Sequence, residues 1–294
     1  MVDTQTSTET DPPPGAPRIA HRQPVTTARR AVVKFGSSVL IDDAGLLDRQ
    51  RIHTFAQALA AWRLSGRECV IVSSGAVAAG RGMLQAIPGP RPRAAVCAAV
   101  GQSLVTAAFQ SAFAVNDLRL AQVLVDPRKA PIRSRATLEP LLQAGIVPLV
   151  NENDALTQID SGIAPFDNDQ LAAELVERLD ADLLVLLTDV HGVFDRDPGE
   201  FPDARLLPTL DPDLLDLTEE EPRLELRSKP KSRKTKTRGP GRGGIRSKLR
   251  AASRARASGC STIIADGRRP GVLSHLLGGE DIGTLVPAAV RRKS

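Results

Sequence analysis

Two lysines in this sequence lie beside small residues that leave the backbone accessible. Lys34 is followed by Gly36-Ser37-Ser38, and Lys248 comes shortly after Gly243-Gly244. Small residues let backbone N–H groups approach an anion closely, and a lysine ammonium adds a positive charge. Two such lysines suit phosphoryl transfer, in which charge must be neutralised on both the transferring group and the leaving group. Taken alone, each pattern is also typical of a solvated lysine beside a turn, and Lys34 has no P-loop sequence around it.

Amides and carboxylates form a second group. Asn151-Glu152-Asn153-Asp154 and Asp167-Asn168-Asp169 bracket one polar loop that directly follows an apolar run. Asn and Asp are common turn residues, so either run alone also fits a turn. Together, a carboxylate and an amide could hold the amino group of a substrate, and could organise a lysine or a metal ion. We therefore take both runs as candidate site residues.

Two further turns complete the candidate set. Ser73-Ser74-Gly75-Ala76 leads into a helical pattern, and it either presents backbone N–H groups to an anion or only caps the helix. Thr188-Asp189-Val190-His191 follows an apolar run and fits a loop around a nucleotide. We expect His191 to be an exposed loop residue, because no other His or Cys lies at metal-ligand spacing. The three cysteines are scattered, which is typical of buried side chains in a reducing compartment.

Apolar runs that alternate with helical spacing predict the elements that position these turns. Several runs are continuously apolar, which indicates parallel strands covered on both faces. We therefore expect an α/β fold, a three-layer α/β/α sandwich with a mainly parallel central sheet. Ligands bind such sheets at the carboxyl ends of the strands, where the turns described above lie. The expected strands are 31–35, 69–72, 120–125, 146–150, 183–187 and 262–265, and the expected helices are 47–64, 76–84, 94–115, 136–144, 168–179, 244–258 and 271–277.

Positive charge is concentrated in one segment. Residues 223–250 contain twelve Lys and Arg and one acidic residue, Glu225, whereas the whole chain of 294 residues has a net charge of only +5. Within this segment, residues 223–238 have few apolar side chains to offset the cost of ordering. We expect this basic insert to be mobile and dispensable for folding. The alternative is a role in binding RNA or another polyanion, as Arg-rich segments do.

Composition argues against several other classes of protein. Aromatic residues make up only 3% of the chain and Tyr is absent, which leaves little for a nucleic-acid reader that stacks bases. No run reaches about 18 consecutive apolar residues, so no membrane-spanning helix is expected. Residues 1–29 are polar and Pro-rich and contain no apolar signal run, so we expect a disordered tail and a cytoplasmic protein.

Several motifs, taken in order, resemble those of the glutamate 5-kinases in the amino acid kinase superfamily. The resemblance covers about residues 30–287, and the order of the motifs makes it more specific than any single one. NEND with a downstream DND separates this family from the aspartate, carbamate, UMP and acetylglutamate kinases. The motifs are AVVKFGSSVL at 31–40, IVSSGAVAAGR at 71–81, AAVGQS at 98–103, VPLVNEND at 147–154, FDNDQLAA at 166–173, ADLLVLLTDVHG at 181–192 and ADGRRP at 265–270.

The resemblance implies a role for each matched residue. Lys34 and Lys248 would stabilise the transferring phosphoryl group, and Asp169 would orient both lysines. The residues that would hold L-glutamate are Ser74, Gly75, Asp154 and Asn168. The residues that would contact ATP are Gly36, Ser37, Thr188, Asp189, Gly243 and Gly244. Residues 30–287 would form the kinase domain and residues 288–294 a tail.

The reaction implied by the resemblance is ATP-dependent phosphorylation of the γ-carboxylate of L-glutamate to L-glutamyl 5-phosphate, the first step of proline biosynthesis. It implies ATP and Mg²⁺, a cytoplasmic homo-oligomer, feedback by proline, and no membrane or nucleic-acid partner. The chain departs from the usual glycine loop of the family at Arg242, Ile245 and Ser247. We expect it to lack the C-terminal PUA domain of many members. Two alternatives stay open: a kinase for another small carboxylate or phosphate acceptor, and a degenerate kinase that binds a polyanion.

Overall fold

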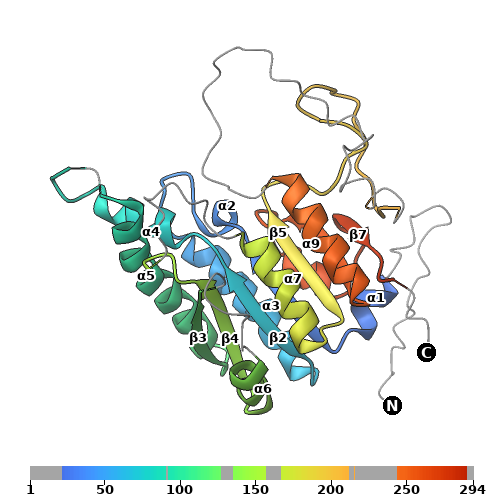
Figure 1. The fold of residues 1–294 in the computed structure, drawn as a ribbon, viewed down its shortest axis with the longest axis horizontal. Helices are drawn as coiled ribbons and strands as arrows, with labels where there is room; N and C mark the ends of the chain where they lie inside the picture. The colour runs from blue at the N-terminus through green and yellow to red at the C-terminus, as the bar shows by residue number, and fades with distance from the viewer. Residues whose placement is uncertain are drawn as a thin grey trace, which may run out of the picture.

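The computed structural model describes residues 22–90, 92–126, 135–156, 167–211, 215 and 244–289. Strands in this part of the chain form one seven-stranded sheet in the order β3-β4-β2-β1-β5-β6-β7 (Figure 1). Neighbouring strands are parallel except for β6 and β7, which pair antiparallel. The strands are β1 (Arg30–Phe35), β2 (Glu68–Ser73), β3 (Arg119–Val125), β4 (Ile146–Glu152), β5 (Leu183–Thr188), β6 (Ser261–Asp266) and β7 (Thr284–Val286).

Helices cover both faces of the sheet. The helices are α1 (Gln23–Thr27), α2 (Ser37–Leu40), α3 (Arg49–Leu64), α4 (Ala76–Leu84), α5 (Ala94–Ala114), α6 (Arg135–Gln143), α7 (Asn168–Leu179), α9 (Ile245–Ala257) and α10 (Val272–Leu277). Successive side chains of a strand point to opposite faces, so each face has its own core. Val33 and Ile71 pack with α3, α5 and α10, whereas Val32 and Val70 pack with α6, α7 and α9. The predicted three-layer α/β/α sandwich with a mainly parallel sheet is confirmed.

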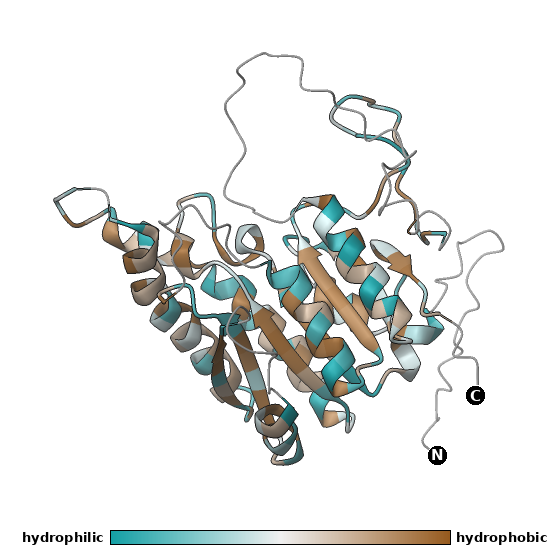
Figure 2. Ribbon diagram, in the orientation of Figure 1, coloured by the Kyte–Doolittle hydropathy of each residue, from teal (hydrophilic) through white to brown (hydrophobic). Residues whose placement is uncertain are grey.

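The hydropathy of the elements explains this layering. Strand β5, which lies next to the middle strand β1, is apolar from Leu183 to Leu187, while α7 and α9 alternate apolar and polar positions around the helix (Figure 2). A strand buried on both faces has no polar side, and a helix that covers a sheet needs one apolar stripe. Each predicted strand and helix therefore occurs within a few residues of its predicted bounds. The structure adds α1, α2 and β7, which the sequence analysis did not predict.

The expectation of a disordered tail over residues 1–29 is wrong for residues 22–29. Helix α1 lies in this segment, and Val25 and Ala28 are buried in the core. Arg22 is also buried, and its guanidinium donates hydrogen bonds to the carbonyls of Pro208, Ile282 and Gly283 and to Asp281. One arginine thus fixes this segment against the chain around β7. Residues 1–21 lie outside the described residues, as do 290–294, Gly243 and the basic insert 223–238.

Helices α4 and α5 cross at two glycines. A Cβ atom on Gly80 would lie 1.8 Å from the carbonyl oxygen of Cys97, and one on Gly101 would lie 1.8 Å from that of Ala76. Both distances are far below contact, so the two backbones touch directly. By length and composition α5 could cross a membrane, but half of that segment is buried within the fold, where Phe109 packs 5.7 Å from Phe35 between ring centroids.

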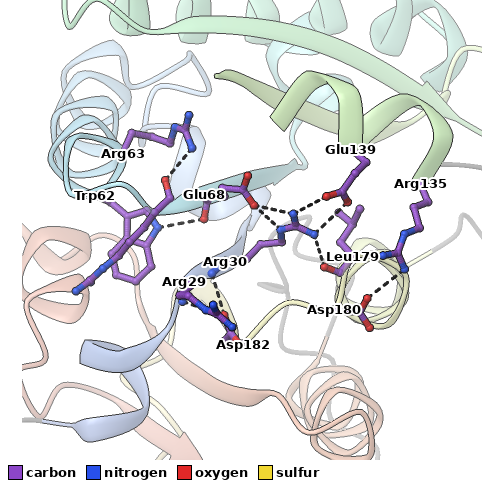
Figure 3. Close-up of polar contacts among 11 residues, drawn as sticks. Arg29, Arg30, Trp62, Arg63, Glu68, Arg135, Glu139, Leu179, Asp180 and Asp182 are labelled. Atoms are coloured by element: carbon purple, nitrogen blue, oxygen red, sulfur yellow. Dashed lines mark hydrogen bonds and ion pairs between the residues drawn. The ribbon is translucent and has the colours of Figure 1, made fainter. Parts of the chain in front are cut away.

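An arginine network closes the end of the sheet opposite the carboxyl ends of the strands. The Arg30 guanidinium, at the start of β1, donates to Glu68 at 2.7 Å and to both carboxylate oxygens of Glu139 at 2.8 and 3.1 Å (Figure 3). It also donates to the carbonyl oxygen of Leu179, the last residue of α7. Burial lowers the pKa of Arg30, but the hydrogen bonds to Glu68 and Glu139 and the negative charges of these two residues together raise it by more. This network ties the C-terminus of α7 to β1.

Candidate active site

The topology brings the predicted turns together at the carboxyl edge of the sheet. Strand β1 lies between β2 and β5, so the turns that follow these three strands are neighbours. The N–H of Gly36 donates to the carbonyl of Leu187 at 3.0 Å, and that of Ser74 donates to Phe35 at 3.1 Å. Gly75 has a φ of +92°, a left-handed conformation that favours glycine, and a Cβ there would lie 3.6 Å from Cα of Ser37.

An ion triad lies at the centre of this edge. The Lys34 ammonium, on β1, is 2.7 Å from Oδ1 of Asp169, and the Lys248 ammonium, on α9, is 3.2 Å from Oδ2. Asp169 is fully buried, and the two lysines are 5% and 4% exposed. Both lysines therefore contact Asp169, which agrees with the arrangement that the resemblance implied. The cluster carries one more positive than negative charge, so it suits an anion.

The charge state of Asp169 follows from the two lysines. Burial alone raises the pKa of this carboxyl, but the charges and hydrogen bonds of Lys34 and Lys248 lower it by more, so the pKa lies below its usual value. Asp169 is therefore a carboxylate throughout the neutral range. A fixed carboxylate between two ammonium groups holds both in place, and its single negative charge leaves the cluster with one net positive charge.

Residues at the start of α7 and α9 hold this triad. Asp167 caps α7 and accepts a hydrogen bond from the N–H of Asp169 at 2.9 Å. The hydroxyl of Ser247 donates to Asp167, and the Gln170 amide donates to the carbonyl of Ser247 at 3.2 Å. Ser247 is one of the positions at which the glycine loop departs from the family pattern. Its hydroxyl nevertheless ties the helix that carries Lys248 to the helix that carries Asp169.

Amides gather beside the triad. The side-chain NH₂ of Asn168 lies 3.0 Å from the hydroxyl of Ser74, 3.1 Å from Oδ1 of Asn151 and 3.2 Å from the carbonyl of Ser73. The Asn151 amide in turn donates to Oε1 of Gln102, on α5, at 2.7 Å. The structure thus joins the two predicted amide clusters and the Ser73–Ala76 turn. The sequence analysis gave Gln102 no role, because its motif carried only the resemblance.

Asp154 lies in a pocket of about 230 Å³ between α5, β3 and the end of β4. The lining residues are Ala98, Ala99, Gln102, Ser103, Gln122, Leu124, Glu152, Asn153, Asp154 and Ala155. This lining combines apolar side chains with amides and carboxylates, as a site for a small polar ligand does. Gln102 belongs both to this pocket and to the amide network of Asn168, so the two are continuous.

The other side of the edge is formed by the ends of β5 and β6. Thr188 is buried, and Asp189 is exposed. Arg268, after β6, donates to the carbonyl of Asp189 at 2.7 Å and to Asp266 at 3.1 Å. Burial raises the pKa of Asp266, but the hydrogen bonds from Arg268 and the nearby positive charge together lower it by more. His191 is exposed and lies 3.6 Å from Asp266. Arg268 was not predicted as a site residue.

Of the predicted glycine-loop residues, Gly244 is exposed and lies directly before the start of α9.

Comparisons with known proteins decide the family. Residues 29–266 match the amino acid kinase family. The chain is also 39% identical over 288 residues to the glutamate 5-kinase of Thioalkalivibrio sulfidiphilus, covering 92% of this chain and 72% of that protein. The chain belongs to the amino acid kinase family, among the glutamate 5-kinases. This membership agrees with the motif order and places the triad at the edge of a kinase fold.

Solved structures of other members share the fold at low sequence identity. An isopentenyl phosphate kinase has a TM-score of 0.61 and 18% identity, covering 87% of this chain and 99% of its own. The carbamate kinase of Giardia lamblia, bound to AMP-PNP, has the same TM-score and identity, and the match covers 90% and 99% of the two chains. The sheet and its helices are therefore those of the amino acid kinase fold.

Proposed function

We propose that this protein catalyses the ATP-dependent phosphorylation of the γ-carboxylate of L-glutamate, giving L-glutamyl 5-phosphate and ADP. The observation that carries the proposal is the Lys34–Asp169–Lys248 triad, placed at the carboxyl edge of a sheet in a chain 39% identical to a glutamate 5-kinase. A carboxylate oxygen attacks the γ-phosphorus as its bond to the leaving ADP breaks. Because this oxygen is already anionic, no general base is needed, and catalysis consists of positioning and charge neutralisation.

In this proposal each lysine neutralises a different part of the reacting system. One ammonium contacts the transferring phosphoryl group and the other the leaving phosphate, where negative charge develops. Asp169 fixes the two ammonium groups, because each of its carboxylate oxygens contacts one of them. ATP itself is assigned to Gly36, Ser37, Thr188, Asp189, Gly243 and Gly244.

Mg²⁺, when bound with ATP, would supply positive charge that offsets the negative charge of the phosphates. Both oxygens of Asp169 already contact lysine ammonium groups. These residues therefore fit an ion that is carried by the phosphates of ATP rather than held by the triad. Such binding is usual for Mg²⁺, which keeps several waters and takes few protein ligands.

We assign the substrate to Ser74, Gly75, Asp154 and Asn168. A carboxylate such as Asp154 suits the ammonium group of an amino acid, and Asn168 and Ser74 offer hydrogen bonds beside the triad. A different small acceptor is the remaining alternative within the kinase class. Proline feedback, a homo-oligomeric state and a cytoplasmic location stay predictions.

A coupled ADP-release assay with a panel of acceptors tests the proposal. The acceptors are L-glutamate, L-aspartate, N-acetyl-L-glutamate, carbamate, UMP and isopentenyl phosphate, and the control for contaminating ATPase is the Lys34→Met variant. We expect turnover with L-glutamate alone, and trapping of the acyl phosphate by hydroxylamine as a hydroxamate. Preferred turnover of another acceptor would replace the substrate assignment, and no turnover with any acceptor would favour the polyanion-binding alternative.

A further inference from the structure

Two buried polar atoms near the triad have no hydrogen-bond partner among the described residues, the hydroxyl oxygen of Ser73 and the side-chain oxygen Oδ1 of Asn168. The second can only accept, and the NH₂ group of the same amide lies within hydrogen-bond distance of three acceptors. A buried polar atom without a partner costs free energy, so it requires a partner from outside the chain, such as a ligand or an ordered water. This oxygen is an acceptor, and it would take a hydrogen bond from a donor such as an ammonium group.

The orientation of the Asn168 amide is set by groups that cannot exchange roles. The carbonyl of Ser73 can only accept, so the nitrogen of Asn168 faces it. Oδ1 of Asn151 accepts from the backbone N–H of Glu152 at 2.9 Å, and that N–H can only donate. Asn151 therefore presents its oxygen to Asn168 and its nitrogen to Gln102. Inverting Asn168 would bring its oxygen against two other oxygens.

Thr106 sets the orientation of the Gln102 amide, which is the last of the three hydrogen-bonded amides Asn168, Asn151 and Gln102. The Thr106 hydroxyl donates to the backbone carbonyl of Gln102 at 2.8 Å, so its single proton is already used. Its oxygen then accepts from Nε2 of Gln102 at 3.4 Å, which leaves Oε1 of Gln102 to accept from Asn151 at 2.7 Å. The direction of every hydrogen bond from α5 to α7 is thereby determined.

We propose that Gln102 is a positioning residue for the amino group of the substrate. It holds the Asn151 amide, which holds the Asn168 amide, so that Oδ1 of Asn168 is the atom left to accept from the ammonium. The inference rests on the proposed function, and it adds a residue on α5 that acts through two others. Without the Gln102 acceptor, the Asn151 amide keeps its contact with the Glu152 N–H but loses its second anchor. Asn151 then holds Asn168 less firmly, and Oδ1 of Asn168 is less well placed to accept from the ammonium.

The test compares two substitutions of Gln102 and two ligands. Gln102→Met keeps the length of the side chain and removes the acceptor, whereas Gln102→Glu keeps an oxygen for Asn151. Glutarate has both carboxylates of glutamate and no ammonium, so its inhibition constant against glutamate reports the pocket without the ammonium contact. We expect Gln102→Met to raise the KM for glutamate about ten-fold. In the same variant, the KM for ATP and the inhibition constant of glutarate should stay within about two-fold of their wild-type values. In Gln102→Glu, the KM for glutamate should return close to its wild-type value.

Thr106→Val supplies a second variant if Gln102→Met does not fold. It removes only the hydroxyl that orients Gln102, and we expect a rise of about three-fold in the KM for glutamate with no change for glutarate. The inference is overturned if glutarate and glutamate weaken equally, or if Gln102→Glu is as impaired as Gln102→Met. An unchanged KM for glutamate in Gln102→Met also overturns it. Absence of glutamate turnover in the unmodified protein would instead refute the proposed function, and the inference with it.

Discussion

Gly80 of α4 and Gly101 of α5 meet where the two helices cross, and neither position has room for a side chain. The nitrogen of Gly80 would lie only 2.5 Å from a Cβ on Gly101. Helix α4 begins directly after Gly75, and Gln102 follows Gly101 on α5. The crossing therefore sets the position of two parts of the candidate site at once.

We predict that Gly101→Ala separates the two helices and destabilises the protein by about 3 kcal/mol or more, because the added methyl meets backbone atoms that cannot move aside. Chemical denaturation would measure the loss. Ala107→Ser, on the exposed side of the same helix, is the matched control and should change stability by under about 0.5 kcal/mol. Wild-type stability in Gly101→Ala would mean that the helices do not cross as closely as described.

We predict that Lys34→Met and Lys248→Met each lower kcat by about 10²- to 10³-fold while the KM for glutamate changes little. The charge of each lysine counts most in the transition state, and loss of such an interaction appears in kcat. Steady-state kinetics with both substrates would measure this. Arg250→Met, an exposed position on α9, controls for loss of positive charge and should leave kcat near wild type. Near-normal kcat in either lysine variant would remove it from phosphoryl transfer.

Asp154→Ala should raise the KM for glutamate about ten- to hundred-fold, because a charge-assisted hydrogen bond contributes about 1.5–3 kcal/mol. The KM for ATP should stay near wild type. Initial-rate measurements with each substrate varied in turn separate the two effects, and Glu200→Ala, in an exposed loop, is the control. A rise confined to the KM for ATP would place Asp154 on the nucleotide side and contradict the assignment.

Asp169→Asn should destabilise the protein by about 3–5 kcal/mol at pH 7, because it leaves two buried ammonium groups without a counter-charge. Adding Lys248→Met to this variant should recover part of the loss, since one uncompensated charge is then removed. The folded pKa of Asp169 lies below the unfolded value of 3.8. Its contribution is therefore complete above that value and is lost as the pH falls through the folded pKa.

Unfolding measured from pH 7 down into this acidic range should show the stability difference between wild type and Asp169→Asn shrinking. A difference that stays constant to the lowest pH at which the wild type folds would contradict an ionised Asp169.

Arg30→Met should cost about 2–4 kcal/mol of unfolding free energy, because it leaves two part-buried glutamates and the Leu179 carbonyl without their donor. Arg135→Met is the matched control, since its ion pair with Asp180 is exposed at both ends and should contribute under about 1 kcal/mol. Thermal and denaturant unfolding of both variants would measure the difference. Equal, small effects would show that the Arg30 network does not anchor α7.

The sequence predicted the inner strands well because these strands are buried on both faces. Runs such as 183–187 are apolar throughout, which distinguishes them from the mixed pattern of the helices. Strand order could not be predicted, because pairing between distant segments leaves no local pattern. Strand β3 shows this limit, since it lies at the edge of the sheet although β1 and β2 precede it in the chain.

Only part of the candidate site could be predicted, because only some of its residues lie in a local sequence pattern. Lys34, Asn168 and Asp169 lie at the ends of predicted elements, so the topology of a parallel sheet brings them to one edge. Gln102 and Arg268 have ordinary residue types in ordinary patterns, and only their hydrogen bonds in the folded chain distinguish them. Their partners lie 49 and 79 residues away in sequence, beyond any local pattern.

Strand β1 is joined to both ends of α7, by Lys34 at Asp169 and by Arg30 at Leu179. It is also the middle strand of the sheet, with buried neighbours on both sides. Backbone amides in such a position exchange with solvent only when the whole domain opens. Lys34, which we propose to act in catalysis, is thus part of the segment that opens last, so the backbone that carries it stays folded while other elements open locally.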